Sequence, residues 1–479
     1  MSDSKYAISE WPDTKEIYKK IDKLMKSPVR TIKEEKMQGY MNYYAEKCKG
    51  SKALNDEAKK YIPGGVQHNL AFNYPFPMAM KKSEGAYMWD VDGNKYIDFL
   101  QAGGPIILGD NYKPVRDKVI ELLQECGPTI GLFHEYELKL AKLINKYMPS
   151  VELFRMLGSG TEGDMAAIRI ARTYTGKRKV IKIGGAYHGW SDQMIYGIHM
   201  PGTGRYEAHG IPEGCSGDTE ESYPNDVEGL RKLLEKNESE GGTAAILLEP
   251  LGPESGTRPV DYDFNKKVRE LCDEFNALLI FDEVVTGFRV GLGGAQGYFN
   301  VKPDLTVFGK IVAGGYPGAG GVGGRRDVMS CVATGLQGKK RAYVGGTLSA
   351  NPLSCAAGYY TIKAIAETDA AVKAGQAGDK ICRGLQNLID KYELPFVVYN
   401  HCSICHLETT GMLFLDVRKP DFMEQLKKRM MLSNQIGAAY MAEGMVTLAG
   451  SRLYTSMADT DDVIDEALAK FENIFQNMK

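Results

Sequence analysis

The sequence lacks the features that mark membrane, nucleic-acid-binding and disulfide-rich proteins. No apolar run approaches the roughly 18 residues that a helix needs to span a bilayer, and the first residues lack the basic flank and apolar stretch of a signal peptide. Acidic and basic residues nearly balance, at 61 and 59, so the net charge favours neither nucleic acid nor a membrane surface. The nine cysteines are an odd number scattered over a large chain, which indicates reduced thiols. We therefore expect a cytoplasmic protein whose partners must be inferred from a local site.

The length of the chain indicates more than one packed unit. With 479 residues, 43% hydrophobic and 25% charged, the composition is globular but too long for one core. Residues 14–60 have apolar side chains at helical spacing, and residues 85–99 alternate around a turn at Asp92-Gly93, which predicts a β-hairpin. We expect an N-terminal helical segment and hairpin over residues 1–104, a large domain over 105–345 and a smaller C-terminal domain over 346–479, with the first segment packing on the last.

Short apolar runs alternate with helical stretches through the large domain. This alternation is typical of a mostly parallel sheet covered by helices on both faces, so the predicted class is α/β. Ligands of such sheets bind at the carboxyl ends of the strands. The predicted strands are residues 152–157, 180–183, 244–248, 277–281 and 305–308.

Small residues follow the first of these strands and precede a helical stretch. The segment GSGTEG (158–163) brings backbone N–H groups and two hydroxyls to a helix N-terminus. Anions bind at such a terminus because its N–H groups are unpaired and the helix dipole is positive there. The segment therefore predicts a phosphate cradle.

The same segment satisfies G-x-G-x-x-G, the fingerprint of nicotinamide and flavin enzymes. The fingerprint belongs to the first strand of its fold and needs an acidic residue about 20 residues later to hold a ribose hydroxyl. The lack of that acid disfavours the alternative. Here the next strand ends in Ile183-Gly184-Gly185, so a dinucleotide is the weaker hypothesis.

Two further strand ends carry charged side chains. Asp282 and Glu283 follow the strand 277–281, and Lys310 follows the strand 305–308. A buried strand seldom ends in two carboxylates without a partner, because unpaired buried charge is costly. An Asp there can bond a protonated pyridine nitrogen, and a desolvated lysine can form an imine. The alternative is a structural ion pair between Asp282 and Lys310 at a strand edge.

Together these motifs resemble the class III aminotransferase family, and especially its glutamate-1-semialdehyde aminomutase-like branch. The resemblance spans residues 60–470 and leaves the first sixty mostly outside. It implies fold type I of the pyridoxal-phosphate-dependent transferases, with a mostly parallel seven-stranded sheet in the large domain and a smaller α+β domain. The matching motifs are PGGV (63–66), the hairpin 87–99, GPIILG (104–109), SGTE (159–162), YHG (187–189), LEP (248–250), FDEV (281–284), Lys310, GT (346–347) and NPL (351–353).

The resemblance implies pyridoxal 5'-phosphate as the cofactor and assigns the residues around it. Lys310 matches the lysine that forms the Schiff base, Asp282 the partner of the ring nitrogen, and Tyr187 the side chain stacked on the ring; these three are the implied catalytic residues. The implied cofactor-binding residues are Ser159, Gly160, Thr161, Tyr187, His188, Glu249, Asp282, Val284, Lys310 and Thr347.

Within that set, the resemblance gives three further roles. Ser159, Gly160 and Thr161 bind the phosphate, and Val284 packs behind the ring. Thr347 matches a residue that reaches the phosphate of the neighbouring subunit. The resemblance therefore implies a homodimer with shared active sites.

The sequence also departs from the aminomutase branch. Gly158 stands where the family has Asn. An Arg that grips the substrate carboxylate follows Pro-Gly-Gly in the branch, whereas this chain reads VQHNLA (66–71) and has no Arg there, and the segment GSRLY (450–454) lacks a clear counterpart of the branch's C-terminal acid. His68, Asn69 and Arg452 are the candidate substrate-binding residues, and the alternative for Arg452 is an exposed structural Arg.

The same core residues serve several reactions. Our leading hypothesis is an aminotransferase that moves an amino group between a small amino acid or amine and a keto acid through Lys310. The alternative is an isomerase, either an aminomutase or an amino-acid epimerase or racemase, and a binding protein that retained the pocket is a third possibility. No motif names the substrate.

One motif matches a haem attachment pattern, but its expected geometry does not suit a metal or haem site. The segment HCSICH (401–406) contains C-x-x-C-H, the haem attachment pattern. In a strand, Cys402 and Cys405 would point to opposite faces. No second C-x-x-C and no His pair lies nearby, so we expect no metal.

Overall fold

The computed structural model describes residues 6–204, 209–333, 340–448 and 450–479, and the chain forms two compact units. Unit 1 contains Lys113–Ala371 together with Tyr6, and unit 2 contains Ala7–Tyr112 and Val372–Lys479. No helix in these described ranges is both long enough and apolar enough to cross a membrane.

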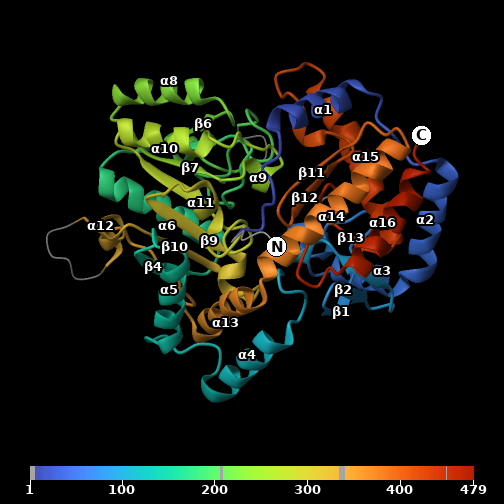
Figure 1. Ribbon diagram of the computed structural model, residues 1–479, viewed down its shortest axis with the longest axis horizontal. Coiled ribbons are helices and arrows are strands. Elements are labelled where there is room, and N and C mark those ends of the chain that lie inside the picture. Colours follow the sequence, from blue (N-terminus) through green and yellow to red (C-terminus); the bar gives the residue numbers. More distant parts are fainter. Residues whose placement is uncertain (1–5, 205–208, 334–339, 449) are drawn as a thin grey trace. The chain divides into compact units, whose positions relative to one another are not determined.

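Unit 1 is built on a seven-stranded sheet in the order β4-β10-β9-β8-β7-β5-β6 (Figure 1). Strand β10 runs antiparallel to both of its neighbours, and the pairs from β9 to β6 are parallel. The structure thus confirms the predicted α/β class. The strands are β4 Leu153–Leu157, β5 Lys179–Ile183, β6 Thr219–Ser222, β7 Thr243–Leu248, β8 Leu278–Asp282, β9 Leu305–Gly309 and β10 Gly320–Gly324.

Two strands of this sheet, β6 and β10, carry no apolar run and were not predicted. Strand β10 reads GGVGG because α6 (Gly160–Thr175) begins directly against it: a Cβ on Gly320 would overlap the backbone of Ser159. Strand β6 reads TEES and lies at the sheet edge, where polar side chains are tolerated. A search for periodic apolar residues detects neither a glycine-rich strand nor a polar strand at a sheet edge.

Helices cover both faces of the sheet. Alternate residues of the strands, among them Leu247, Ile280 and Val307, share one apolar core with α6. The residues between them, such as Ile246 and Leu279, are equally buried, as expected for a parallel sheet packed on two sides. The helices α8 Val227–Glu238 and α10 Phe264–Glu274 contact β7.

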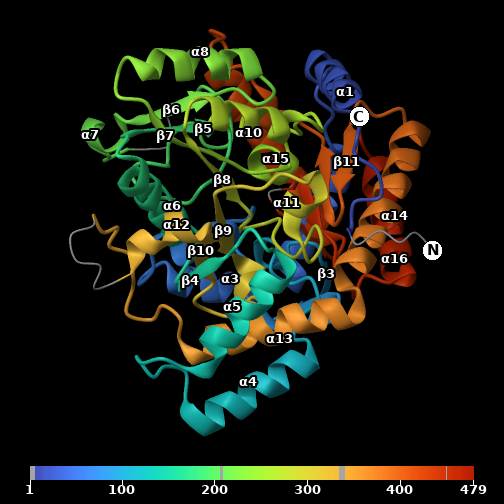
Figure 2. The same ribbon diagram turned by 60° about the vertical axis from the view of Figure 1, so that its left-hand side comes forward.

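The helix α13, Pro352–Thr368, extends unit 1 to Ala371, beyond the expected boundary at residue 345. It lies beside α4, Lys113–Cys126, as Figure 2 shows. It also contacts α5 (Glu135–Tyr147) and the 3₁₀ helix η4 (Lys310–Ala313). A Cβ on Gly358 would overlap the carbonyl oxygen of Val312, so this glycine permits the close approach of α13 to η4. The short helices of the unit are α7 Glu213–Ser216, α9 Pro253–Gly256, α11 Gly294–Phe299, α12 Arg326–Met329 and η5 Ser330–Val332.

Unit 2 contains two smaller sheets. One has the order β1-β2-β3-β13 and includes the predicted hairpin, in which β2 and β3 pair antiparallel; the other has the order β11-β12-β14. Their strands are β1 Met80–Glu84, β2 Tyr87–Asp90, β3 Lys95–Asp98, β11 Val397–His401, β12 Ile404–Glu408, β13 Met445–Val446 and β14 Arg452–Tyr454.

The N-terminal helices of unit 2 share an apolar core with its C-terminal helices. Ile17 and Ile21 of the first helix belong to the same buried cluster as Ile381 and Phe471, so residues far apart in the sequence form one core. The helices are α1 Thr14–Lys26, α2 Glu34–Lys47, α3 Lys49–Ala58, α14 Ala370–Lys391, α15 Phe422–Ala442 and α16 Asp461–Phe475, with η1 Pro63–Gly65, η2 Asn69–Ala71, η3 Gln101–Gly103 and η6 Met412–Phe414.

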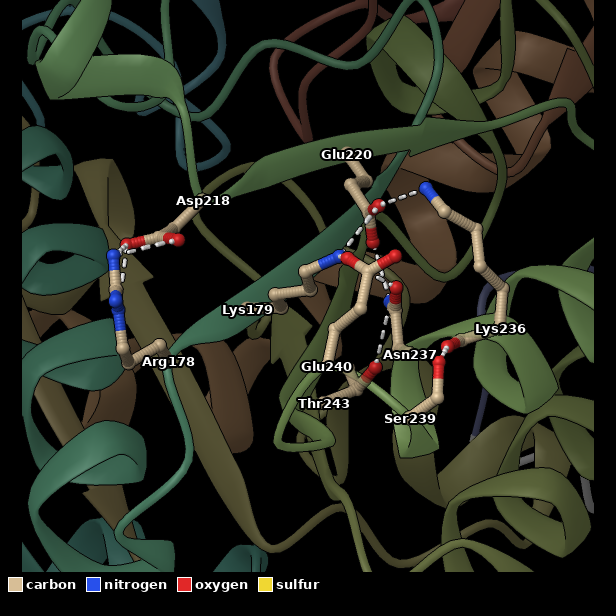
Figure 3. Close-up of polar contacts among 9 residues, drawn as sticks. All are labelled: Arg178, Lys179, Asp218, Glu220, Lys236, Asn237, Ser239, Glu240 and Thr243. Atoms are coloured by element: carbon tan, nitrogen blue, oxygen red, sulfur yellow. Dashed lines mark hydrogen bonds and ion pairs between the residues drawn. The ribbon is translucent and has the colours of Figure 1, made fainter.

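A polar network secures the edge of the large sheet in unit 1 (Figure 3). Asn237, at the end of α8, is fully buried; its amide donates to Glu220 of β6 and, at 3.0 Å, to Thr243 of β7. Its Oδ1 accepts a hydrogen bond of 2.9 Å from Lys179 of β5, and Lys179 also pairs with Glu220 and Glu240. One amide therefore joins a helix to three strands.

We expect Asn237→Leu to lower the free energy of unfolding by about 1–3 kcal/mol, because the buried partners of the amide would lose their bonds. The matched control is Arg178→Ala, which removes the ion pair between Arg178 and Asp218. Because the Arg178 side chain is 81% exposed, this substitution should change the free energy of unfolding by less than about 0.5 kcal/mol. Denaturant unfolding of the cofactor-free protein measures both. Equal effects of the two substitutions would contradict the network's role.

Candidate active site

Several polar and charged residues of unit 1 lie in the segments that follow its strands, at the carboxyl edge of the sheet. Strands β9, β8, β7 and β5 are consecutive and parallel, so the segments that follow them emerge at the same edge. The contacts link these segments pairwise: His188 to Asp282 by a hydrogen bond, and Gly189 to Thr161 by a close approach that leaves no space for a Cβ. The segment that follows β5 therefore contacts both the end of β8 and the start of the helix that follows β4.

The predicted phosphate cradle is the N-terminus of α6. Ser159 is the N-cap, and its Oγ accepts a hydrogen bond of 3.2 Å from the N–H of Glu162. The carboxylate of Glu162 accepts one of 2.7 Å from the N–H of Gly158, and a Cβ on Gly158 would come within 2.9 Å of this carboxylate. Gly158 therefore gives Glu162 the space to fold back over the start of the helix. A sixteen-residue helix with a glycine at its first position offers an anion its backbone N–H groups and its positive dipole end.

Asp282 ends β8 and is 4% exposed. Its Oδ1 accepts a hydrogen bond of 2.9 Å from the N–H of Val284, and its Oδ2 lies 2.7 Å from Nδ1 of His188. Burial lowers the pKa of His188, so the imidazole is neutral near pH 7, and its Nδ1 donates to the carboxylate. His188 thus fixes one oxygen of Asp282.

The neighbouring carboxylate, Glu283, has a different environment. It accepts hydrogen bonds from Thr286, from the N–H groups of Ala295 and Gln296, and from the Gln296 side chain. Burial raises the pKa of Glu283. Its acceptor capacity is used in holding the start of α11, whereas Asp282 accepts from one backbone N–H and one imidazole.

Lys310 follows β9 with a positive φ of 48° and is partly exposed. The side chain of Val284 separates the lysine segment from the phosphate cradle. A Cβ on Gly309 would approach Val284 to 2.7 Å, and one on Gly160 would approach it to 2.9 Å. Val284 is therefore held between the two segments by residues that have no side chain.

Tyr187 lies in a loop whose backbone is bonded to the carboxylate of Glu249. The Tyr187 ring is half exposed and stacks on His199, with ring centroids 6.3 Å apart and planes 8° apart. Its N–H donates to Glu249 at 3.1 Å, and the same carboxylate accepts bonds from the N–H of Glu254 and from the N–H and hydroxyl of Ser255. Glu249 thus anchors the backbone that carries Tyr187.

The side chain of Lys182 holds the same loop, and this role was not predicted from the sequence. It is fully buried in β5, and its ammonium donates to the carbonyl oxygens of Ala186, Met194 and Tyr196. Burial lowers its pKa to about 8. The available signal was a charged residue inside the apolar run Val180–Ile183, which is rare unless the charge is paired.

Four of the predicted residues, one in unit 1 and three in unit 2, have the following surroundings within their own units. Thr347 is exposed. His68 and Asn69 are exposed at the start of η2 in unit 2, where His68 Nδ1 accepts the N–H of Leu70 at 3.1 Å. Arg452 is in β14 of unit 2 and is 8% exposed, so the alternative of an exposed structural Arg is wrong.

The residues that have metal-ligand spacing in the structure are not those of the C-x-x-C-H motif. The segment 401–406 is not one strand: β11 and β12 are joined by a tight turn at Cys402, whose φ is 50°. Among the described residues, the group with metal-ligand spacing is Asp164, His188 and Asp282, whose ligand atoms lie within 4.8 Å of one another. Because Asp282 belongs to the edge described above, we assign this group to that site.

The donor set at this edge fits pyridoxal phosphate. The N-terminus of α6 suits the phosphate, the buried Asp282 suits a protonated ring nitrogen, Tyr187 and Val284 offer an aromatic and an apolar surface, and Lys310 supplies an amine. The two glycines that face Val284 leave space beside it that a side chain would fill.

Comparison with known proteins identifies the family. The class III aminotransferase family matches residues 71–475. Glutamate-1-semialdehyde 2,1-aminomutase 1 of Lachnoclostridium phytofermentans is 36% identical over 440 residues, covering 90% of this chain and 99% of its own. The corresponding aminomutase of Chlorobium limicola is 41% identical over 352 residues, covering 72% and 80%.

Solved structures give the same fold, fold type I. An ω-transaminase from Sphaerobacter thermophilus superposes with a TM-score of 0.81 at 28% identity, covering 91% of this chain and 99% of its own. A glutamate-1-semialdehyde aminomutase from Pseudomonas aeruginosa superposes with a TM-score of 0.79 at 20% identity, covering 96% and 99%. A further neighbour, at 25% identity and a TM-score of 0.78 with 90% and 97% covered, is a transaminase with bound pyridoxal phosphate.

We expect Lys182→Met to destabilise the protein by roughly 2 kcal/mol or more, because three buried carbonyl groups would lose their donor. It should also weaken binding of pyridoxal phosphate, since the loop that carries Tyr187 and His188 would be released. Lys302→Met, at an exposed lysine of the same unit, is the control. Thermal unfolding and a cofactor titration measure the two effects, and an unchanged dissociation constant in Lys182→Met would contradict the role given to Lys182.

Proposed function

Because the chain belongs to the class III aminotransferase family, whose members depend on pyridoxal phosphate, we propose that it moves an amino group within one small substrate, as an aminomutase. The observation that carries this proposal is the full-length likeness to proteins named glutamate-1-semialdehyde 2,1-aminomutase, which extends over nine tenths of the chain. Isomerisation was the alternative in our sequence analysis, and the relatives favour it over the leading hypothesis of transfer.

The chain's own residues divide the work as follows. Ser159, Gly160 and Thr161 bind the cofactor phosphate at the start of α6, and Asp282 pairs with the ring nitrogen. Bound pyridoxal phosphate supplies an electron sink for the charge that develops on the substrate carbon. Lys310 would hold the cofactor through its amine and, once that amine is free and neutral, would act as the base that removes a proton from the substrate carbon or returns one to it.

The substrate pocket is expected to differ from that of the named relatives. The segment 66–71 contains no Arg to grip a carboxylate, and the exposed His68 and Asn69 stand there instead. We propose His68, Asn69 and Arg452 as substrate-binding residues of unit 2. A substrate with a small amino-carbonyl core and a different acidic group, or none, is consistent with this replacement.

Transfer to a second molecule is the other candidate. It is favoured by the likeness to the solved ω-transaminase, which is the structure that superposes with the TM-score of 0.81. The core residues proposed for the aminomutase serve transfer equally well. The two reactions differ only in whether the first product leaves before the amino group is returned.

A homodimer is part of the same proposal. Thr347 is exposed in the single chain, and several large apolar side chains of unit 1 are exposed as well, among them Leu132, Phe133, Tyr343 and Leu348. Exposed apolar side chains of this size are typical of surfaces that bind another chain. We propose that Thr347 reaches the cofactor phosphate of the partner subunit.

A cytoplasmic location completes the proposal. It is supported by the nine cysteines, all of which are free thiols in the structure, as expected in a reducing compartment.

The reaction is tested by supplying a single amino-carbonyl compound, beginning with glutamate 1-semialdehyde, with and without a keto-acid acceptor. An aminomutase converts it repeatedly without acceptor. Turnover that stops after one equivalent and resumes when the acceptor is added would reject migration in favour of transfer. Lys310→Ala should lower the rate at least about 100-fold, whereas Lys302→Ala should leave it unchanged. Borohydride reduction followed by peptide mapping should place the pyridoxyl group on residue 310.

The shared site is tested by mixing two inactive variants, Lys310→Ala and Thr347→Asp. If Thr347 acts across the interface, a mixed dimer contains one intact site, and random pairing should restore about a quarter of the wild-type activity. Activity of the mixture no greater than the mean of the two separate variants would contradict the proposal.

A further inference from the structure

Asp164 is a buried acid that the proposed reaction does not use. It lies in the first turns of α6, on the helix face that also buries Ala167, Ile168 and Ala171, and is 1% exposed. A carboxylate on such a face is costly unless it is paired or protonated. Its presence therefore requires a physical account.

The surroundings of Asp164 are polar on one side. Its carboxyl group, a ring nitrogen of His188 and a carboxylate oxygen of Asp282 lie within 4.8 Å of one another. Oδ1 of Asp164 and Nε2 of His188 are both buried and have no hydrogen-bond partner within the described part of the chain. Two unpaired polar atoms in the same buried group are complementary if one of them carries a proton.

Several charges act on this carboxyl group. Burial contributes most to raising the pKa of Asp164 well above its ordinary value, and the negative charges of Asp282 and Glu249 add to it. The ammonium groups of Lys182 and Lys310 oppose the shift without cancelling it. These effects favour the protonated carboxylic acid, which can donate a hydrogen bond, over the carboxylate.

His188 needs a donor on its far side. Its Nδ1–H is committed to Asp282, at 2.7 Å, so the neutral ring leaves Nε2 as an acceptor. We propose that Asp164 is a positioning residue that acts through His188, its acid group donating to Nε2 directly or through one water molecule. This bond selects the tautomer in which Nδ1 holds an oxygen of Asp282.

The consequence concerns the charge at the ring nitrogen of the cofactor. With Asp164 protonated, the row Asp164, His188 and Asp282 carries a single negative charge, located on Asp282. That charge favours a protonated pyridine nitrogen, which strengthens the electron sink. The inference rests on the proposed pairing of Asp282 with the cofactor, and it adds a residue whose role does not require contact with the cofactor.

The protonation state is tested first, without the cofactor. The infrared difference spectrum between wild-type protein and Asp164→Asn at pH 7 should show the C=O stretch of a protonated carboxylic acid that is lost in the variant. A carboxylate band in its place would overturn the proposal. Because Asn has nearly the same shape as Asp, this measurement does not depend on a variant with a disrupted core.

The effect on the cofactor is tested with pyridoxal phosphate labelled with ¹⁵N in the ring. The nitrogen chemical shift should report a protonated ring in wild-type protein and in Asp164→Asn, whose amide still donates. In Asp164→Leu, which has no donor, the shift should move toward the unprotonated value, and the dissociation constant should rise about tenfold or more. Asp273→Leu, at an exposed acid of α10, is the control and should match wild type.

Two results would overturn this step: Asp164→Leu with the wild-type shift and affinity, or Asp164→Asn resembling Asp164→Leu. Action through His188 predicts that Asp164→Leu adds little in a His188→Ala background, and a full additional effect there would equally reject it. If wild-type protein itself holds an unprotonated ring, the proposed role of Asp282 fails, while the infrared result still decides the state of Asp164.

Discussion

The structure depends on keeping one carboxylate, Asp282, buried and usable at the end of a central strand. A buried carboxylate is tolerated only where donors compensate for the lost water. Asp282 has the N–H of Val284 and the imidazole of His188 for this purpose. His188 reaches the end of this strand on a loop, and Lys182 and Glu249 hold the backbone of that loop through hydrogen bonds. The position of His188 beside Asp282 therefore depends on these two residues.

This arrangement distinguishes Asp282, the proposed partner of the cofactor, from the carboxylates that hold the backbone. Glu249 and Glu283 are as buried as Asp282, yet each accepts bonds from several backbone and side-chain donors. Their oxygens are occupied in fixing loops. Carboxylates at the ends of β7 and β8 therefore differ in how many local donors bond them, and the proposed role of Asp282 depends on its having fewer.

Much of the fold and site could be predicted from the sequence, and the failures have physical causes. The strand ends at Asp282 and Lys310 can be predicted because apolar runs precede them, and the small residues of 158–163 predict an anion site by their chemistry. Strand β10 escaped because it consists mostly of glycine, which a close helix requires. Asp164 and Lys182 escaped because each is a charged residue inside an apolar pattern, and only the three-dimensional neighbours show what compensates it.

The division between the two units explains why the cofactor can be inferred more readily than the substrate. All of the proposed cofactor ligands lie in unit 1, whereas His68, Asn69 and Arg452 lie in unit 2. Cofactor chemistry needs the same few groups in every member of the family, so motifs in unit 1 reveal it. Migration and transfer share those groups and differ in how long the first product stays bound. That retention depends on the side chains that close over the substrate, and such residues need no fixed motif, since any shape and charge that complements the substrate suffices.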